Sequence, residues 1–412
     1  MTAEPGADRP VTPESILRAV RAGAGVVRET PIVTARTLSE RSGTRIALKA
    51  ENLQGTGSFK LRGAMAKLSA LGERTGAGVV CGSAGNHAQA VAYAARARGV
   101  PCEVFMPELA PIAKADAVRA LGATLHLGGR SVDDAVAAAR SRADEAGMQF
   151  IHPFDDPDVI SGQAGVGLEL LGQVPDLARI VVPVGGGGLI SGIAVAVRAQ
   201  RPEVEVIGVQ VEACSSFRAS LQAGRPVAVE SVRTIADGIA VKRPGDITLR
   251  LIDELVADMV LVDEDQVAEA MVFLLERSKL VVEGAGAVGV AALLADRLPG
   301  PVEGTTVIVL SGGNVGAGML AEVARRHETQ AHRRLVLRVR IPDLPGSLAA
   351  LLGMVSQTGA NLLDVQHIRE GLDLHIQETA VQLVLETRGA EHAGAVRAAL
   401  AAGGYEETTE FL

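Results

Sequence analysis

A single lysine, Lys60, stands among small and apolar residues in the segment TGSFKLRGA, residues 56–64. Its only charged neighbour there is Arg62, whereas a lysine on an exposed helix usually has charged partners three or four residues away. Removing an amine from water favours its neutral, nucleophilic form, which Schiff-base chemistry requires. Taken alone, the stretch favours a plainer interpretation, a lysine whose stem lies on apolar surface while its head reaches water. Motifs elsewhere in the chain are needed to distinguish a catalytic lysine from a surface lysine.

A run of four glycines, residues 185–188 in VPVGGGGLISG, follows an apolar strand-like segment and precedes a helical one. Residues without side chains let backbone N–H groups converge on a phosphate, and the start of a helix adds partial positive charge. The run matches neither the GxGxxG dinucleotide fingerprint nor a Walker motif. It predicts a phosphate site, with a tight packing turn as the alternative.

Two other turns place polar side chains after predicted strands. In CGSAGNHAQA, Ser83 and Asn86 stand where a helix begins, which suits a carboxylate ligand, although a plain helix cap explains them equally well. In VLSGGN, the hydroxyl of Ser311 could face a ring nitrogen without forcing it to be protonated, or could be an ordinary loop serine. Together with the lysine and the phosphate site, these turns predict pyridoxal 5'-phosphate as cofactor.

The segments between these turns alternate strand-like Val/Ile runs with Ala-rich helical stretches. The strands are expected within GVVCG, CEVFMP, RIVVPV, VEVIGVQVE and TTVIVL. Continuous apolar runs indicate strands buried on both faces, as in parallel sheets, whose ligands bind at the carboxyl ends of the strands. After about residue 330, LVLRVRI and AVQLVLE alternate apolar with polar residues, which predicts a ferredoxin-like unit.

Five motifs in this order resemble the serine/threonine dehydratase group of fold-type II pyridoxal-phosphate enzymes: GSFKLRGA, SAGNHAQ, PVGGGGLISG, EGAGA and LSGGN. The tail, with IPDLPGSL and GANLLDVQHIR, resembles an ACT regulatory domain. The resemblance implies an α/β fold of two parallel-type subdomains followed by a ferredoxin-like ACT domain. It divides the chain into a flexible tail (1–10), a catalytic domain (11–325, with a smaller subdomain at 57–160), a linker (326–332) and the ACT domain (333–412).

The resemblance also implies roles for individual residues. Lys60 would form the Schiff base and later take the α-proton, and a carboxylate of the substrate would be received by Ser83, Asn86 and His87. Asn86 would also bond the 3-hydroxyl oxygen of the cofactor ring. The cofactor-binding residues besides Lys60 would be Phe59, Asn86, Gly185, Gly186, Gly187, Gly188, Leu189, Gly238, Glu283 and Ser311. For Glu283, a carboxylate that merely favours the start of a helix is an equally good explanation. The implied reaction is threonine ammonia-lyase chemistry feeding isoleucine synthesis, with threonine or serine as substrate.

Two positions set the chain apart from related serine racemases. Ala84 replaces the serine that would serve as a second acid/base group, so racemization is not expected. Gln210 and Ser216 are neutral where those relatives hold a divalent cation with carboxylates, so no metal site is predicted.

In the tail, the resemblance assigns an amino-acid effector, isoleucine or valine, to a domain–domain interface formed by Asp343, Leu344, Gly346 and Asn361. A module used for packing alone is the alternative. The family also suggests a homotetramer. Two rival functions stay open: a catabolic serine/threonine dehydratase, and a catalytically silent amino-acid sensor.

Composition excludes several other classes. The net charge of −8 and the absence of a basic, aromatic-rich cluster argue against nucleic-acid binding. The three cysteines form no CxxC pair, which suits a reducing cytoplasm, and the start resembles no signal peptide. One uncharged stretch, residues 180–197, has the length of a membrane span, but a proline and four glycines interrupt it. A cytoplasmic protein without a membrane partner is expected.

Overall fold

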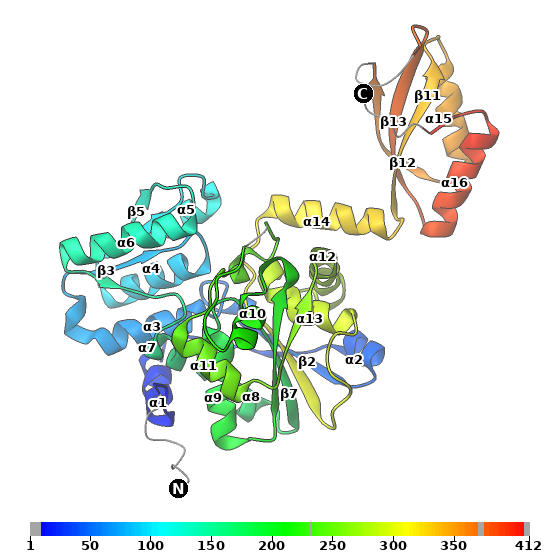
Figure 1. Cartoon of the computed structure of the whole chain (residues 1–412). Helices are drawn as coiled ribbons and strands as arrows, with labels where there is room; N and C mark the ends of the chain where they lie inside the picture. Colours follow the sequence, from blue (N-terminus) through cyan, green and yellow to red (C-terminus); the bar gives the residue numbers. More distant parts are fainter. Residues whose placement is uncertain (1–9, 231–232, 370–374, 408–412) are drawn as a thin grey trace. The chain divides into compact units, whose positions relative to one another are not determined.

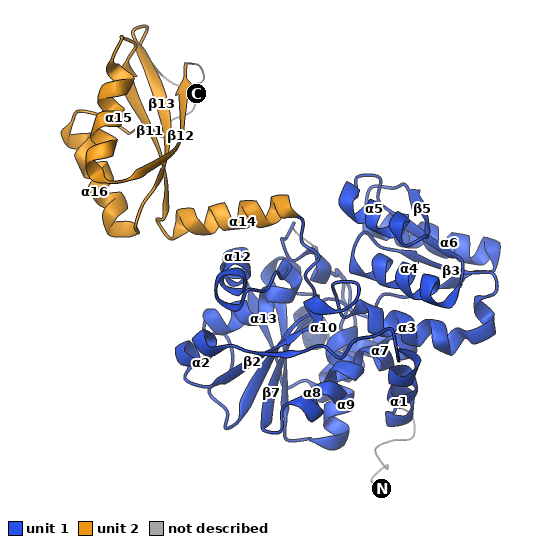
Figure 2. Cartoon of the chain, turned by 180° about the vertical axis from the view of Figure 1, so that it is seen from behind, with its two compact units in different colours: residues 1–316 blue, residues 317–412 orange. Residues whose placement is uncertain are grey.

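The computed structural model describes residues 10–230, 233–369 and 375–407, and the chain divides into two compact units, Met1–Gly316 and Ala317–Leu412 (Figure 2). The predicted flexible tail, residues 1–10, lies almost entirely outside the described residues. The boundary differs from the predicted one at residue 325. Helix α14 (Ala317–Gln330) runs through most of the expected linker and is joined by a short turn to the first strand of the second unit.

The core of the first unit is a six-stranded sheet that is parallel except for its edge strand β1. Its strands, in spatial order, are β1 (Ile32–Thr34), β2 (Arg45–Ala50), β10 (Thr305–Leu310), β7 (Leu177–Pro183), β8 (Glu205–Val211) and β9 (Asp258–Val262). The central strands are buried almost throughout, as their uninterrupted apolar runs predict. The parallel-sheet prediction for RIVVPV, VEVIGVQVE and TTVIVL is confirmed.

A smaller, fully parallel sheet of four strands forms the core of a second subdomain within the same unit (Figure 1). Its strands are β5 (Thr124–Leu127), β4 (Cys102–Met106), β3 (Val79–Gly82) and β6 (Gln149–Phe150). Helices α4 (Asn86–Arg98), α5 (Ile112–Ala120) and α6 (Val132–Ala146) cover it. Strands within GVVCG and CEVFMP are therefore confirmed.

The remaining helices of the first unit cover the larger sheet or join the two sheets. They are α1 (Pro13–Ala22), α2 (Arg36–Ser42), α3 (Lys60–Leu71), α7 (Pro157–Gln163), α8 (Gly165–Gln173), α9 (Gly188–Gln200), α10 (Ser216–Ala223), α11 (Asp246–Leu255), α12 (Glu264–Phe273) and α13 (Gly284–Leu294). The uncharged stretch 180–197 is a strand, a glycine turn and a helix, as expected. Among the described residues, no helix is long and apolar enough to cross a membrane.

The second unit is a three-stranded antiparallel sheet with helices, the ferredoxin-like arrangement predicted from its alternating strands. The strand order is β11 (Arg334–Pro342), β13 (Glu378–Glu386) and β12 (Asn361–Ile368), and the helices that follow β11 and β13 are α15 (Ser347–Thr358) and α16 (Ala390–Ala402). In place of the expected last strand, the structure describes a single bridge from Val339 to Glu407; residues 408–412 lie outside the described residues.

Candidate active site

Lys60 is the first residue of α3, and its amine is held by a neutral acceptor. Nζ donates to the Pro153 carbonyl at 2.8 Å and lies 5.2 Å from the centre of the Phe59 ring. Burial lowers the pKa of Lys60 to about 8, although the charge of Glu283 opposes this shift. Because a carbonyl carries no charge to hold a proton, the amine is neutral in a large share of molecules at mildly alkaline pH.

The segment that supplies the Pro153 carbonyl is itself held by contacts to α4 and α11 and by one internal hydrogen bond. The buried ring of His87 bonds the Ile151 carbonyl through Nε2 at 2.9 Å. The His152 ring accepts from the backbone N–H of Asp155 at 2.8 Å, and the Asp155 carboxylate accepts from three N–H groups in the first turn of α11. Burial lowers the pKa of His87 to about 3 and that of His152 to about 4, so both rings are neutral near pH 7.

These contacts limit the predicted role of His87 in binding a substrate carboxylate. The side chain of His87 is committed to Ile151, so it cannot also receive a substrate carboxylate as a cation; its backbone N–H, in the first turn of α4, retains that possibility. Ser83 directly follows β3, and its hydroxyl accepts from the Gly85 N–H at 3.2 Å, as a turn-capping serine does. The role of these residues in binding a carboxylate stays a prediction.

The glycine run lies where it was predicted, between the end of β7 and the start of α9. Gly187 has φ +88°, and a Cβ atom at Gly186 would lie 2.1 Å from the Phe154 ring. A side chain at Gly185 would meet Ile239 at 2.8 Å, immediately after Gly238. The loop therefore needs glycines for close packing, and the same packing brings it against the residue that follows Pro153, the acceptor of Lys60. Leu189 is buried in the first turn of α9.

The turn that contains Ser311 is joined to the lysine segment by backbone contacts. The Phe59 N–H donates to the Ser311 carbonyl at 3.1 Å, the Gly313 N–H donates to the Gly57 carbonyl at 2.9 Å, and Ser58 pairs with Gly312 in an isolated bridge. Ser311 is buried at the end of β10. The two motifs, about 250 residues apart in sequence, therefore lie side by side in the folded chain.

Hydrogen-bonded side chains link the turn that contains Ser311 to the start of α4. Asn86 Nδ2 donates to Glu283 Oε1 at 2.6 Å, and Asn314 Nδ2 donates to Asn86 Oδ1 at 2.8 Å and to the Thr56 carbonyl at 2.9 Å. Burial raises the pKa of Glu283 to about 7. Gly238 lies beside this carboxyl group, 3.7 Å from it when a Cβ is added. Asn314 was not singled out from the sequence, although it belongs to the LSGGN motif.

Arg62, two residues after Lys60, anchors α3 in a buried ion-pair network. Its guanidinium binds both oxygens of Glu51 at 2.7 and 2.8 Å and both oxygens of Glu169 at 2.6 and 2.9 Å. Lys49 Nζ contacts Glu169 at 2.5 Å. Arg62, Glu51 and Lys49 are all buried, so the network fixes the helix that begins with Lys60.

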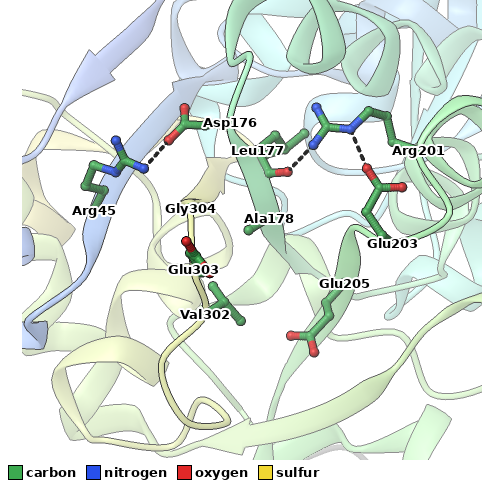
Figure 3. A pocket seen from close by; sticks show the side chains of 10 residues that line it. All are labelled: Arg45, Asp176, Leu177, Ala178, Arg201, Glu203, Glu205, Val302, Glu303 and Gly304. Carbon is green, nitrogen blue, oxygen red and sulfur yellow. Dashed lines mark hydrogen bonds and ion pairs between the residues drawn. The ribbon is translucent and has the colours of Figure 1, made fainter.

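A separate hollow of about 490 Å³ lies at the opposite, amino ends of the strands (Figure 3). Its arginines are already engaged: Arg45 pairs with Asp176 at 2.7 Å, and Arg201 pairs with Glu203 at 2.6 Å. Ligands of parallel sheets bind at the carboxyl ends, where Lys60, the glycine run and Ser311 lie. This hollow is therefore not assigned to the active site.

The two neutral residues discussed as departures from a cation site are bonded to the protein. Gln210 accepts from the Phe217 N–H at 3.1 Å, and Ser216 donates to the Val241 carbonyl at 2.7 Å.

The predicted effector residues do not converge within one chain. Asp343 forms a two-bond pair with Arg369 (2.5 and 2.9 Å) beside exposed Leu344 and Gly346, the residue before α15. Asn361 donates to Glu386 at 3.1 Å. The strand register puts Asn361 and Asp343 at opposite ends of the sheet, about eight residues along β13 and roughly 26 Å apart. The four residues therefore do not form one cluster within a chain, and their role at a domain–domain interface stays a prediction.

The fold and the arrangement of lysine, glycine turn and buried serine define the class, fold-type II pyridoxal-phosphate enzymes. Residues 24–330 match the family described as pyridoxal-phosphate dependent enzyme, and the chain belongs to it. The chain is 46% identical to an L-threonine ammonia-lyase of Thermotoga maritima, over 96% of this chain and 98% of that one. A catabolic L-threonine dehydratase of Escherichia coli K12 is 41% identical over 77% of this chain and 97% of its own. The solved structure of the processed form of threonine deaminase isoform 2 from Solanum lycopersicum has a TM-score of 0.71 and 35% identity, over 77% of this chain and 89% of that one.

The residues present fit the cofactor that the family uses. The glycine loop has no room for side chains, as a backbone phosphate cradle requires, and it opens a helix. Burial lowers the pKa of the Lys60 amine to about 8, which makes the neutral form that an aldehyde partner requires more accessible. Ser58 adds a fully buried hydroxyl without a protein partner in the described structure, beside Phe59 and Lys60. The protein is a pyridoxal 5'-phosphate-dependent enzyme.

Proposed function

We propose that this enzyme is a threonine ammonia-lyase, which converts L-threonine to 2-oxobutanoate and ammonia. The observation that carries the proposal is the buried Lys60 amine with lowered pKa, held on a neutral carbonyl next to the glycine loop. The similarity to the Thermotoga maritima enzyme, which spans both units of the chain, supports the substrate.

Each residue has a distinct task in this proposal. Bound pyridoxal 5'-phosphate supplies an aldehyde and an electron sink for charge at the substrate Cα. Lys60 Nζ takes the α-proton, and the Pro153 carbonyl orients this amine. The backbone N–H groups of Gly185–Gly188 and Leu189 hold the phosphate, Phe59 packs against the ring, and Ser311 faces its nitrogen. The backbone around Ser83, Asn86 and His87 receives the substrate carboxylate.

Absorbance and product formation test this proposal together. The purified holoenzyme should show the absorbance of bound cofactor and release 2-oxobutanoate when L-threonine is added. Lys60→Ala should lose both. Lys67→Ala is the matched control, because Lys67 lies on the same helix but pairs with Asp156 and Asp158. Cofactor absorbance without product would mean that threonine is not the substrate. Unchanged activity in Lys60→Ala would refute the mechanism.

We also propose that the second unit is an ACT domain whose effector site is shared between two copies of the chain. Because Asp343 and Asn361 lie at opposite ends of one sheet, a site that uses both needs one residue from each copy. Such sharing accords with a homotetramer in the cytoplasm, where the three cysteines, all buried, form no disulfide. Isoleucine should inhibit and valine oppose it.

Variants of the second unit test the effector proposal. Asp343→Ala should abolish inhibition by isoleucine and leave turnover without effector unchanged. Arg397→Ala, which breaks the exposed pair with Glu407 in the same unit, should leave inhibition intact. If neither amino acid changes the rate of the unmodified enzyme, the effector proposal fails.

The catabolic alternative has one specific observation in its favour: the Escherichia coli relative matches nearly its whole length to 77% of this chain. The matched 77% of the chain is about the size of the first unit, which contains all of the active-site residues described above. A response to a nucleotide instead of isoleucine would favour this role.

A further inference from the structure

The side chains of Asn314, Asn86 and Glu283 form a connected network in which every donor and acceptor is determined. The Thr56 carbonyl can only accept, so the atom of Asn314 that faces it must be Nδ2. The same Nδ2 faces Asn86, whose nearest atom must therefore be Oδ1. Nδ2 of Asn86 is then turned toward Glu283, and an ionised carboxylate can only accept.

This hydrogen-bond pattern leaves one N–H of the Asn86 side-chain amide without an acceptor among the described residues. The side-chain amide has two N–H bonds; Glu283 takes one, and within the described residues the other has no hydrogen-bond acceptor. Reversing the amide would set Oδ1 against the Glu283 carboxylate and Nδ2 against Asn314 Nδ2, so both neighbours oppose the reversal. The remaining N–H is thus available only as a donor.

We propose that Asn314 and Glu283 are positioning residues that fix the Asn86 amide so that its free N–H donates to the ring oxygen of the cofactor. The inference rests on the family resemblance, which implies that the Asn86 side chain bonds the 3-hydroxyl oxygen of the cofactor ring. Asn314 acts twice, because its backbone N–H also lowers the pKa of the Glu283 carboxyl group. Glu283 in turn depends on Gly312, where a Cβ atom would lie 2.2 Å from Oε1.

The network is sensitive to the protonation of Glu283. Its pKa is raised to about 7, chiefly by burial and also by Asp237, while Lys114, Asn86 and Asn314 oppose the shift. Lys60, from α3, is the other charged group that interacts with this carboxyl. Below pH 7 the protonated carboxyl can donate as well as accept, so Asn314 alone then opposes reversal of the Asn86 amide. Above pH 7 the orientation is fixed.

The experiment measures cofactor affinity and the absorbance of the bound cofactor from pH 6 to 9. Asn314→Asp has nearly the same size but can only accept, so it should raise the cofactor dissociation constant more than Asn314→Ala does, by roughly 10-fold or more relative to the unmodified enzyme. Asn52→Ala is the control, because Asn52 also donates Nδ2 to a carbonyl, that of Val281, without touching Asn86. It should change the constant by less than about 3-fold.

Glu283→Gln gives a second test that does not depend on how well the Asn314 variants fold. The glutamine can still accept from Asn86 but does not titrate, so the absorbance change centred near pH 7 in the unmodified enzyme should disappear. A midpoint near 7 that persists in Glu283→Gln, or an Asn314→Asp variant that binds cofactor as well as the unmodified enzyme, would overturn the inference. Threonine turnover is measured separately: loss of the threonine proposal would leave these spectral results unaffected.

Discussion

Replacing Arg62 by methionine should destabilise the enzyme far more than the loss of an ordinary surface arginine. The guanidinium makes two hydrogen bonds to each of two carboxylates, Glu51 and Glu169. After substitution, Lys49 still neutralises Glu169, which is 18% exposed. Glu51 is fully buried and keeps a hydrogen bond only from the Thr30 hydroxyl among these partners. Its charge is then left with the Coulomb attraction of Lys49 but without an ion-pair contact.

The size of the effect follows from that stranded charge. Removing one partner of a buried ion pair costs about 3–5 kcal/mol, because the remaining ion keeps its desolvation penalty without compensation. Whole domains are stable by only about 5–15 kcal/mol. With a urea dependence of about 3 kcal/mol per molar, the unfolding midpoint should fall by roughly 1–2 M.

The assay is urea unfolding of the holoenzyme at a fixed cofactor concentration, with Arg179→Met as control. Arg179 is equally buried, but its partner Glu205 is 44% exposed and returns to water when the pair is broken. The control should therefore cost about 1–2 kcal/mol. Adding Glu51→Gln to Arg62→Met should recover at least about 2 kcal/mol, since the stranded charge is then gone. A cost for Arg62→Met no larger than the control, or simple additivity in the double variant, would refute this reasoning.

Two further predictions concern the glycine loop and the lysine. Gly186→Ala should weaken cofactor binding at least about 10-fold, because its Cβ would lie 2.1 Å from the Phe154 ring, and adding Phe154→Ala should restore part of the affinity in an equilibrium titration. For Lys60, burial lowers the folded pKa to about 8 from 10.5, so between these values the unfolded chain holds a proton that the folded apoprotein lacks. Stability of the apoprotein should therefore rise with pH across this window, while Lys60→Met, followed by the same urea midpoints, should lack that rise.

The sequence predicted the parts of the site that depend on local pattern. The Val/Ile runs specify buried parallel strands, and each glycine-rich turn falls at a carboxyl end, so Lys60, the glycine run and Ser311 could be expected to converge. The alternating strands of the tail likewise specified an antiparallel sheet. These features are readable because strand burial and turn geometry are set by neighbouring residues.

What could not be predicted are partners that only the folded chain brings together. The Lys60 amine bonds a backbone carbonyl 93 residues away, and no side-chain motif marks Pro153 as its acceptor. Asn314 lies in a motif interpreted for its serine, and its importance appears only when Asn86 and Thr56 lie beside it. The tail motifs gave effector residues but not the fact that Asp343 and Asn361 lie at opposite ends of one sheet, because that depends on strand register.

The opening turn of α3 gives two cations opposite electrostatic surroundings. Residues two apart on a helix point about 200° away from each other, so Lys60 and Arg62 reach different sides of it. Arg62 meets two carboxylates, which raise its pKa despite burial and keep it charged. Lys60 meets a carbonyl and an aromatic ring, and burial lowers its pKa. Exchanging these surroundings would give a permanently protonated lysine that could not act as a nucleophile or a base. The buried carboxylates therefore contribute to catalysis by lying on the far side of the helix, where they hold it in place and leave the lysine proton free to depart.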